Sequence, residues 1–194
     1  MNRTILVGAF ALLSLLPSHV AQAAEHVGKF VIYDDVADVI GFEGPIDDST
    51  AGDFRRALAA RPGAKVLLLN SGGGDVDDAL RLAGTIRQRG LGTAIPRGAA
   101  CYSACSYLFF AGHEHIVRGE LGVHQVAAAG SSERAYDGDV REALRRYGAP
   151  AGVIAAMIST PPNRLHVFSA REIAALAINR TGGSKSLTAV YAER

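Results

Sequence analysis

An uninterrupted apolar run in the middle of the chain constrains its fold more than any other feature. Residues Lys65–Asn70 read KVLLLN, and they precede the glycine-rich turn Ser71–Gly74 and the amphipathic stretch Asp75–Arg89, which Gly90 closes. A strand without polar alternation is typical of a parallel sheet that is buried on both faces. Parallel strands need crossover connections, so this strand–turn–helix pattern predicts an α/β fold.

Strands and helices alternate along the rest of the chain in the same manner. The other expected strands are 29–33, 39–42, 92–95, 115–117 and 122–124. The other expected helices are a helix capped at 47–49 that runs to 60, and 103–111, 140–147, 151–158 and 169–177, with loops at 96–100 and 127–139. No internal repeat and no interdomain linker interrupts this order, which predicts one domain.

The first residues have the pattern of a secretory signal peptide. Arg3 supplies a positive charge, Ile5–Leu16 is apolar, and Ala21–Ala23 is a small-x-small cleavage site. The apolar run is shorter than the roughly 20 residues that span a bilayer. We therefore expect residues 1–24 to be a signal peptide and 25–194 to be a single domain, located in the periplasm or secreted, with no stable membrane span after cleavage.

Composition narrows the classes of partner and cofactor. The net charge of +1 and the absence of a basic run argue against nucleic acid as a partner. His113 and His115 lack nearby carboxylate or cysteine ligands in the sequence, so we expect neither a metal nor another cofactor. The two cysteines, Cys101 and Cys105, favour a disulfide over a pair of buried thiols in an oxidising compartment.

Three separate segments carry groups suited to hydrolysis. Asn70–Asp75, NSGGGD, lies between a strand and a helix, where consecutive glycines can direct backbone N–H groups at an oxyanion. Gly98–Cys105 places Ser103 near the start of an apolar helix. Gly122–Gln125 ends a short strand with His124. Taken singly, these are equally well a tight turn, a helix cap and a structural histidine.

The order and spacing of the three segments resemble the Clp protease proteolytic subunit, and more closely the secreted bacterial Clp-protease-like proteins with a CxSAC motif. NSGGG stands for the family's NSPGG loop, with Gly72 in place of proline, and GVHQ resembles its histidine-bearing strand. The resemblance covers residues 37–176. It implies the Clp-protease/crotonase spiral, built from β-β-α units around a mostly parallel sheet.

The resemblance also implies an exported serine hydrolase, specifically a peptidase. Ser103 matches the nucleophile and His124 the base, and the backbone N–H groups of Gly73 and Ala104 match the oxyanion hole. Asn163 takes the place of the third triad member, an acid in the family, when counted from Thr160. The other carboxylates considered for this role are Asp137, Asp139 and Glu172.

Three alternatives share parts of this pattern. A serine–lysine protease would need Lys29, Lys65 or Lys185 as its base. An acyl-CoA enzyme of the crotonase type would need coenzyme A, which is not expected outside the cytoplasm. A non-catalytic binding or assembly module would keep the glycine groove without turnover. The partners expected for the hydrolase are a peptide or protein substrate and a second copy in a homo-oligomer, without an ATPase.

Overall fold

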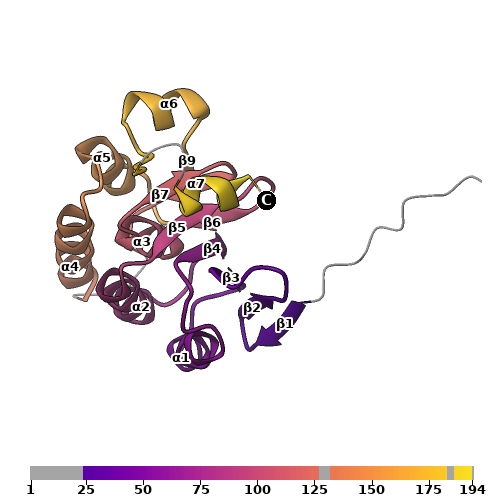
Figure 1. Ribbon diagram of the computed structural model, residues 1–194. Helices are drawn as coiled ribbons and strands as arrows, with labels where there is room; N and C mark the ends of the chain where they lie inside the picture. Colours follow the sequence, from indigo (N-terminus) through magenta and orange to yellow (C-terminus); the bar gives the residue numbers. More distant parts are fainter. Residues whose placement is uncertain (1–23, 127–131, 183–185, 194) are drawn as a thin grey trace, which may run out of the picture.

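A main sheet of six strands runs through the chain in the order β1–β2–β3–β4–β5–β7. The computed structural model describes residues 24–126, 132–182 and 186–193 (Figure 1). The strands are β1 (Ala24–Val27), β2 (Phe30–Tyr33), β3 (Val39–Glu43), β4 (Val66–Asn70), β5 (Gly92–Ile95) and β7 (His115–Val117). The pairs β3–β4, β4–β5 and β5–β7 are parallel, and β1 and β2 add an antiparallel hairpin.

A smaller sheet stands beside the main one and carries the candidate site. Its strands are β6 (Ala100–Tyr102), β8 (Glu120–Val123) and β9 (His166–Val167), in the order β6–β8–β9. The helices are α1 (Thr50–Ala60), α2 (Val76–Arg89), α3 (Cys105–Ala111), α4 (Ser132–Tyr147), α5 (Ala151–Ser159), α6 (Ala170–Ala175) and α7 (Leu187–Ala192). The repeating order of strands and helix winds the chain into the predicted α/β spiral (Figure 1).

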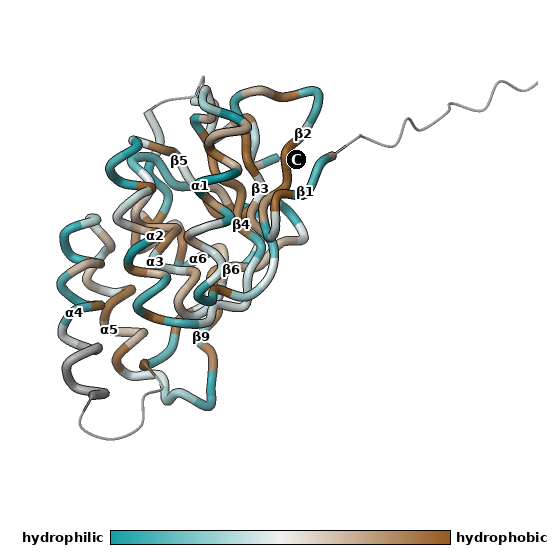
Figure 2. Tube along the Cα trace, turned by 90° about the horizontal axis from the view of Figure 1, so that it is seen from below, coloured by the Kyte–Doolittle hydropathy of each residue, from teal (hydrophilic) through white to brown (hydrophobic). Residues whose placement is uncertain are grey.

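The continuous apolar run of β4 is explained by burial on both faces of the main sheet. Leu67 and Leu69 belong to the large core that the first helices cover, whereas Val66 and Leu68 face a second cluster that includes Tyr191 of α7. Apolar residues are accordingly concentrated in the strands, and the surface loops are largely hydrophilic (Figure 2). Alternate side chains of one strand point to opposite faces, so a strand covered on both sides has no polar position.

Several elements differ from the sequence predictions because tertiary contacts create them. The expected loop 96–100 is followed by β6, which exists through its pairing with β8. The helix expected at 140–147 begins at Ser132 instead. The helix expected to begin at Ser103 starts at Cys105, because Ser103 has a left-handed backbone that no right-handed helix accommodates. β9 and α7 were not predicted.

His115 makes the stability of this fold depend on pH. Its ring is 2 % exposed and contacts the rings of Phe109 and Phe110, and burial lowers its pKa to about 4. The unfolded chain has the ordinary histidine pKa of about 6.5, so it binds the proton first as the pH falls. The contribution of His115 to the free energy of unfolding is therefore fully present above pH 6.5 and is lost as the pH falls toward 4.

We expect the free energy of unfolding to fall by about 2 kcal/mol between pH 7 and pH 5 through this residue alone. Urea denaturation at both pH values, compared between the wild type and His115→Leu, measures that contribution. The variant should lose this part of the pH dependence. The same pH dependence in both proteins would contradict the assignment.

Candidate active site

Ser103 and His124 each follow the carboxyl end of one of two neighbouring parallel strands. β6 pairs with β8 in a register that sets Tyr102 opposite Gly122. The Ser103 N–H donates to the Gly122 carbonyl oxygen at 3.0 Å, which extends this pairing by one residue. The parallel register therefore brings the predicted nucleophile and base to the same edge of the small sheet.

Backbone hydrogen bonds hold the glycine-rich loop against β6. The Ser71 N–H donates to the Ala100 carbonyl at 2.7 Å, and the Tyr102 N–H donates to the Ser71 carbonyl at 2.9 Å. From the other side, the Ile46 N–H donates to the Gly73 carbonyl at 2.9 Å. The loop after β4 is thus fixed between two segments, one of which leads directly to Ser103.

Gly73 packs so closely against the nucleophile segment that a side chain has no room. A Cβ atom at this position would lie 2.8 Å from the Ser103 Cβ and 3.0 Å from the Ala104 nitrogen. Gly73 also has a φ of 97°, which disfavours any L side chain. By contrast, nothing lies within 4 Å of a Cβ built at Gly72, the position where the resembling family has proline.

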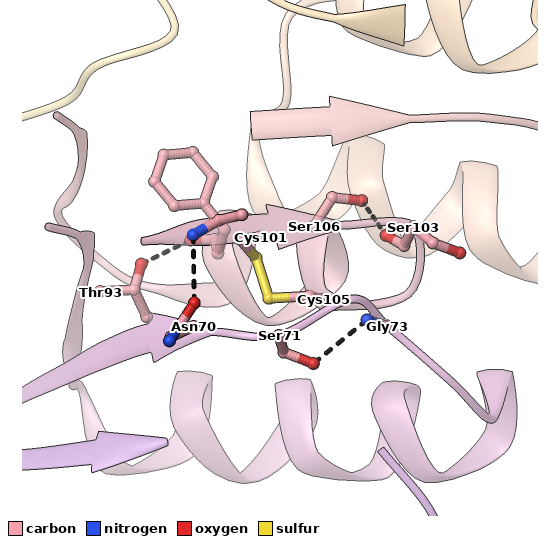
Figure 3. The surroundings of a disulfide bond; sticks show 10 residues. Asn70, Ser71, Gly73, Thr93, Cys101, Ser103, Cys105 and Ser106 are labelled. Atoms are coloured by element: carbon pink, nitrogen blue, oxygen red, sulfur yellow. Dashed lines mark hydrogen bonds between the residues drawn. A yellow bond between two sulfur atoms is a disulfide. The ribbon is translucent and has the colours of Figure 1, made fainter. Parts of the chain in front are cut away.

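Ser103 has a left-handed backbone conformation, with a φ of 54°. For a residue other than glycine this conformation costs about 1–2 kcal/mol. Its carbonyl accepts hydrogen bonds from the Ser106 N–H at 2.9 Å and from the Ser106 hydroxyl at 2.7 Å, as Figure 3 shows for the hydroxyl. The sharp turn separates Ser103 from the helix that follows.

The expected disulfide between Cys101 and Cys105 is present and spans this turn (Figure 3). It links the middle residue of β6 to the first residue of α3, with the two Cα atoms 5.2 Å apart. Both cysteines are completely buried. A crosslink that closes so short a loop stabilises a protein by about 2 kcal/mol in the chain-entropy model.

The two predicted oxyanion donors are in different hydrogen-bonding states. The Gly73 N–H donates to the Ser71 hydroxyl oxygen at 3.1 Å (Figure 3). Within the described part of the chain, the Ala104 N–H donates to no acceptor. In the ligand-free site, the Gly73 N–H is therefore already bonded to the hydroxyl of Ser71, a buried residue.

The ring of His124 is oriented by the backbone of the next residue. Its Nδ1 atom lies 2.6 Å from the Gln125 carbonyl oxygen, a hydrogen bond in which Nδ1 is the donor. In the neutral ring with this donor, the Nε2 atom is the proton acceptor that a general base needs. Nε2 does not hydrogen-bond to the Ser103 hydroxyl in this ligand-free state, and such bonds often tighten only when substrate is bound.

Among the candidates for the third triad member, those whose side chains the structure describes do not contact His124. Asn163 is exposed, and its side chain makes no hydrogen bond to this histidine. Glu172 caps α6 through Ser169, and its Oε1 atom lies 3.0 Å from Nε2 of a different histidine, His166. Asp139 is exposed on α4, and the side chain of Asp137 lies outside the described residues. The backbone of Gln125 is the observed partner of Nδ1.

A groove of about 570 Å³ runs along the glycine-rich loop, and it is bounded by Gly44, Pro45, Asn70, Ser71, Gly72, Gly73, Gly74, Ala100 and Tyr102. Tyr102, the residue before the nucleophile, forms part of its wall, and the Tyr102 hydroxyl donates to Glu120. The groove thus includes Gly73 and the residue before Ser103, whereas Ser103, Ala104 and His124 are not among its lining residues.

The roles of Ser71, Ser106 and Gly122 were not predicted from the sequence. Ser71 and Ser106 orient the loop and the turn through the hydrogen bonds described above. Gly122 leaves no room for a side chain, since a Cβ there would lie 2.8 Å from the Tyr102 ring and 3.0 Å from Leu165. Isolated serines and glycines carry no sequence signal for these roles, because the roles depend on strand pairing.

Solved protein structures provide the comparison for this arrangement. No protein-family model matches the chain, and no curated protein matches it. A serine-to-alanine variant of the 1510-N membrane-bound stomatin-specific protease is similar, with a TM-score of 0.54, 17 % identity, and coverage of 72 % of this chain and 75 % of that chain. A lysine-to-alanine variant of the same protease, in complex with a substrate peptide, has a TM-score of 0.55 and 16 % identity, and the match covers 72 % of this chain and 71 % of that chain. These likenesses establish a Clp-protease-like fold.

Proposed function

We propose that this chain is an exported serine hydrolase, specifically a peptidase, with Ser103 as its nucleophile and His124 as its base. The observation that carries the proposal is the left-handed Ser103, packed against Gly73 and placed beside the strand that precedes His124. A strained backbone at a single serine is typical of a functional site. The likeness in fold to solved proteases supports the choice of a peptide bond as the target.

The proposed reaction follows from the positions of these groups. The Ser103 hydroxyl attacks the carbonyl carbon of the substrate, and the Nε2 atom of His124 accepts its proton. The carbonyl electrons move to oxygen, where the N–H groups of Gly73 and Ala104 stabilise the negative charge. His124 then donates this proton to the leaving amine as the C–N bond breaks, which leaves an ester on Ser103. Water attacks the ester and gives a proton to His124, which passes it to the Ser103 oxygen as the acid product leaves. The Gly73 N–H must exchange Ser71 for the substrate oxygen in the first step.

The lysines within the described residues are engaged elsewhere, which favours histidine as the base. Lys29 forms an ion pair with Asp47 and donates to the Ser49 hydroxyl at 2.8 Å. The Nζ atom of Lys65 lies 3.6 Å from Asp38. Lys185 lies outside the described residues. A lysine-dependent mechanism at Ser103 therefore has no support from Lys29 or Lys65.

The proposed location and partners rest on the sequence pattern of the first residues and on the proposed activity. Residues 1–24 are proposed as a signal peptide that directs the protein to the periplasm or outside the cell; residues 1–23 lie outside the described residues. In the part of the chain that the structure describes, no helix combines the length and apolar character needed to cross a membrane. The proposed partner is a peptide or protein substrate, with assembly into homo-oligomers and without an ATPase, nucleic acid or cofactor.

Replacing His124 tests its role as the base. We expect His124→Gln to lower the rate of Ser103 labelling by a fluorophosphonate probe by about 10²–10⁴-fold, because the hydroxyl loses its proton acceptor. The exposed His113 offers a matched control, and His113→Gln should label at the wild-type rate. Equal labelling of wild type and His124→Gln would exclude this histidine as the base.

A non-catalytic binding module is the second candidate function. It is favoured by one observation: among the described residues, no carboxylate contacts His124, whose Nδ1 faces the Gln125 carbonyl instead. Without a charged partner, the imidazolium formed during catalysis is less stabilised, and loss of the acid charge in a serine protease triad lowers turnover about 10⁴-fold. Peptide binding in the groove without any probe labelling of the wild type would favour the module over the enzyme.

A further inference from the structure

The two cysteines of the Cys101–Cys105 disulfide flank the proposed nucleophile in the sequence. Cys101 is fixed within β6, where it pairs with Leu121 of β8 and forms a bridge with Ser71. Cys105 is the first residue of α3. Ser103 lies midway between them, and it is one of only two non-glycine residues with a positive φ in the described chain.

Local preferences act against this conformation of Ser103. Ala104 already has right-handed helical dihedrals, with φ −58° and ψ −23°, and α3 follows directly. A right-handed Ser103 would extend the helix by another residue and turn the serine away from its present position against Gly73. The left-handed turn at Ser103 therefore needs a constraint from outside the turn. The disulfide is such a constraint, because it links Cys101 in β6 to Cys105 at the start of α3.

We propose that the disulfide sets the reactive conformation of Ser103, so that the reduced chain folds but is a latent hydrolase until Cys101 and Cys105 are oxidised. This inference rests on the proposed function. In the activating step the two thiols lose two protons and two electrons, and one Sγ–Sγ bond forms. A protein disulfide that accepts the two electrons and two protons becomes a dithiol, and a small-molecule disulfide becomes two thiols. The proposed export route supplies such oxidants, because disulfides form in oxidising compartments.

Burial of the cysteines explains how the reduced chain can still fold and how the oxidised chain stays active. Both side chains are completely buried in the large core, where free thiols pack as small apolar groups. The crosslink closes a loop of few residues, so most of the fold does not depend on it. The same burial shields the two thiols and the bond that replaces them, so exchange in either direction requires local opening of the turn between β6 and α3.

Refolding the same chain with and without a disulfide donor tests the proposal. Denatured, reduced protein is refolded either with glutathione disulfide or with an excess of dithiothreitol, and Cys101→Ala/Cys105→Ala serves as a permanently uncrosslinked form. Circular dichroism should show all three to be folded. The two uncrosslinked forms should label with the fluorophosphonate probe at least about tenfold more slowly, and later oxidation should rescue only the wild type.

A second readout separates this inference from the proposed function. The Cα and Cβ chemical shifts of Ser103 report its backbone conformation without any catalysis. We expect chemical shifts typical of a left-handed backbone in the oxidised protein and of a right-handed backbone in both uncrosslinked forms. This shift supports the role of the disulfide even if no form reacts with the probe, a result that would contradict the proposed enzyme alone. Left-handed values in the uncrosslinked forms, or failure of both forms to fold, would overturn the inference.

Discussion

Gly73→Ala is expected to lower probe labelling and peptide hydrolysis by at least about 10²–10³-fold, the effect of losing one oxyanion donor. The added Cβ would lie 2.8 Å from both the Ser103 Cβ and the Tyr102 carbonyl oxygen, closer than such atoms can approach. The φ of 97° adds backbone strain for alanine. The loop must therefore move away from the nucleophile, and its N–H group leaves the oxyanion position. Labelling and hydrolysis rates of the purified variants measure this effect.

The neighbouring glycine provides a closely matched control. A Cβ at Gly72 meets no atom within 4 Å, so Gly72→Ala should keep wild-type activity although it changes the same loop by the same group. The expected result is therefore a large loss at one position and none at the next. Full activity of Gly73→Ala, or an equal loss in both variants, would contradict the oxyanion role of Gly73.

Ser103→Ala is expected to abolish fluorophosphonate labelling and to reduce hydrolysis to background. Removal of a catalytic serine from a complete serine protease triad lowers turnover about 10⁶-fold. The substitution removes only the hydroxyl and keeps the Cβ. The backbone strain at a φ of 54° is similar for alanine and serine. We therefore expect the variant to fold and to keep its disulfide. Mass spectrometry of the labelled protein identifies the modified residue.

An exposed serine outside the site controls for nonspecific modification. Ser159, at the end of α5, donates its hydroxyl hydrogen bond to the Ala156 carbonyl at 3.2 Å and lies outside the proposed site. Ser159→Ala should label like the wild type. Labelling that persists in Ser103→Ala would place the reactive nucleophile elsewhere and would remove the central assignment.

The parts of the fold that follow from local pattern were predictable. The apolar run of β4 indicates burial on both faces, and the structure confirms it with clusters on each side. Asp75 caps α2 by accepting a hydrogen bond from the Asp78 N–H at 2.8 Å, and Gly90 ends the same helix with a left-handed φ of 65°. In these elements, the residues that define the boundary interact with their own helix, so the sequence contains the necessary information.

The parts that depend on distant segments were not predictable. β6 has three residues and no alternating pattern, and it exists because Ser71 and β8 provide hydrogen-bonding partners on both sides. The conformation of Ser103 likewise depends on Gly73, Gly122 and the disulfide. Local pattern favours a helix from Ser103 onward, and the tertiary contacts override it.

The candidate site was predictable only in part, through the order of its three segments. Parallel strand ends explain why segments so far apart can meet, and the register of β6 and β8 places Ser103 and His124 at one edge. The third member was not predictable in this way. Asn163 was placed by counting from a threonine, whereas the orientation of the His124 ring is set by the backbone of its own neighbour, Gln125.

A crystal structure of the oxidised protein with a peptidyl boronic acid tests the central claim most directly. Boronic acids bind a serine oxygen and form a tetrahedral adduct like the intermediate of the proposed reaction. The account predicts a bond from boron to the Ser103 Oγ, one boronate oxygen within about 3 Å of the Gly73 and Ala104 nitrogens, and the other near Nε2 of His124. A boronate oxygen directed away from both nitrogens, or a His124 ring that remains out of reach, would contradict the account.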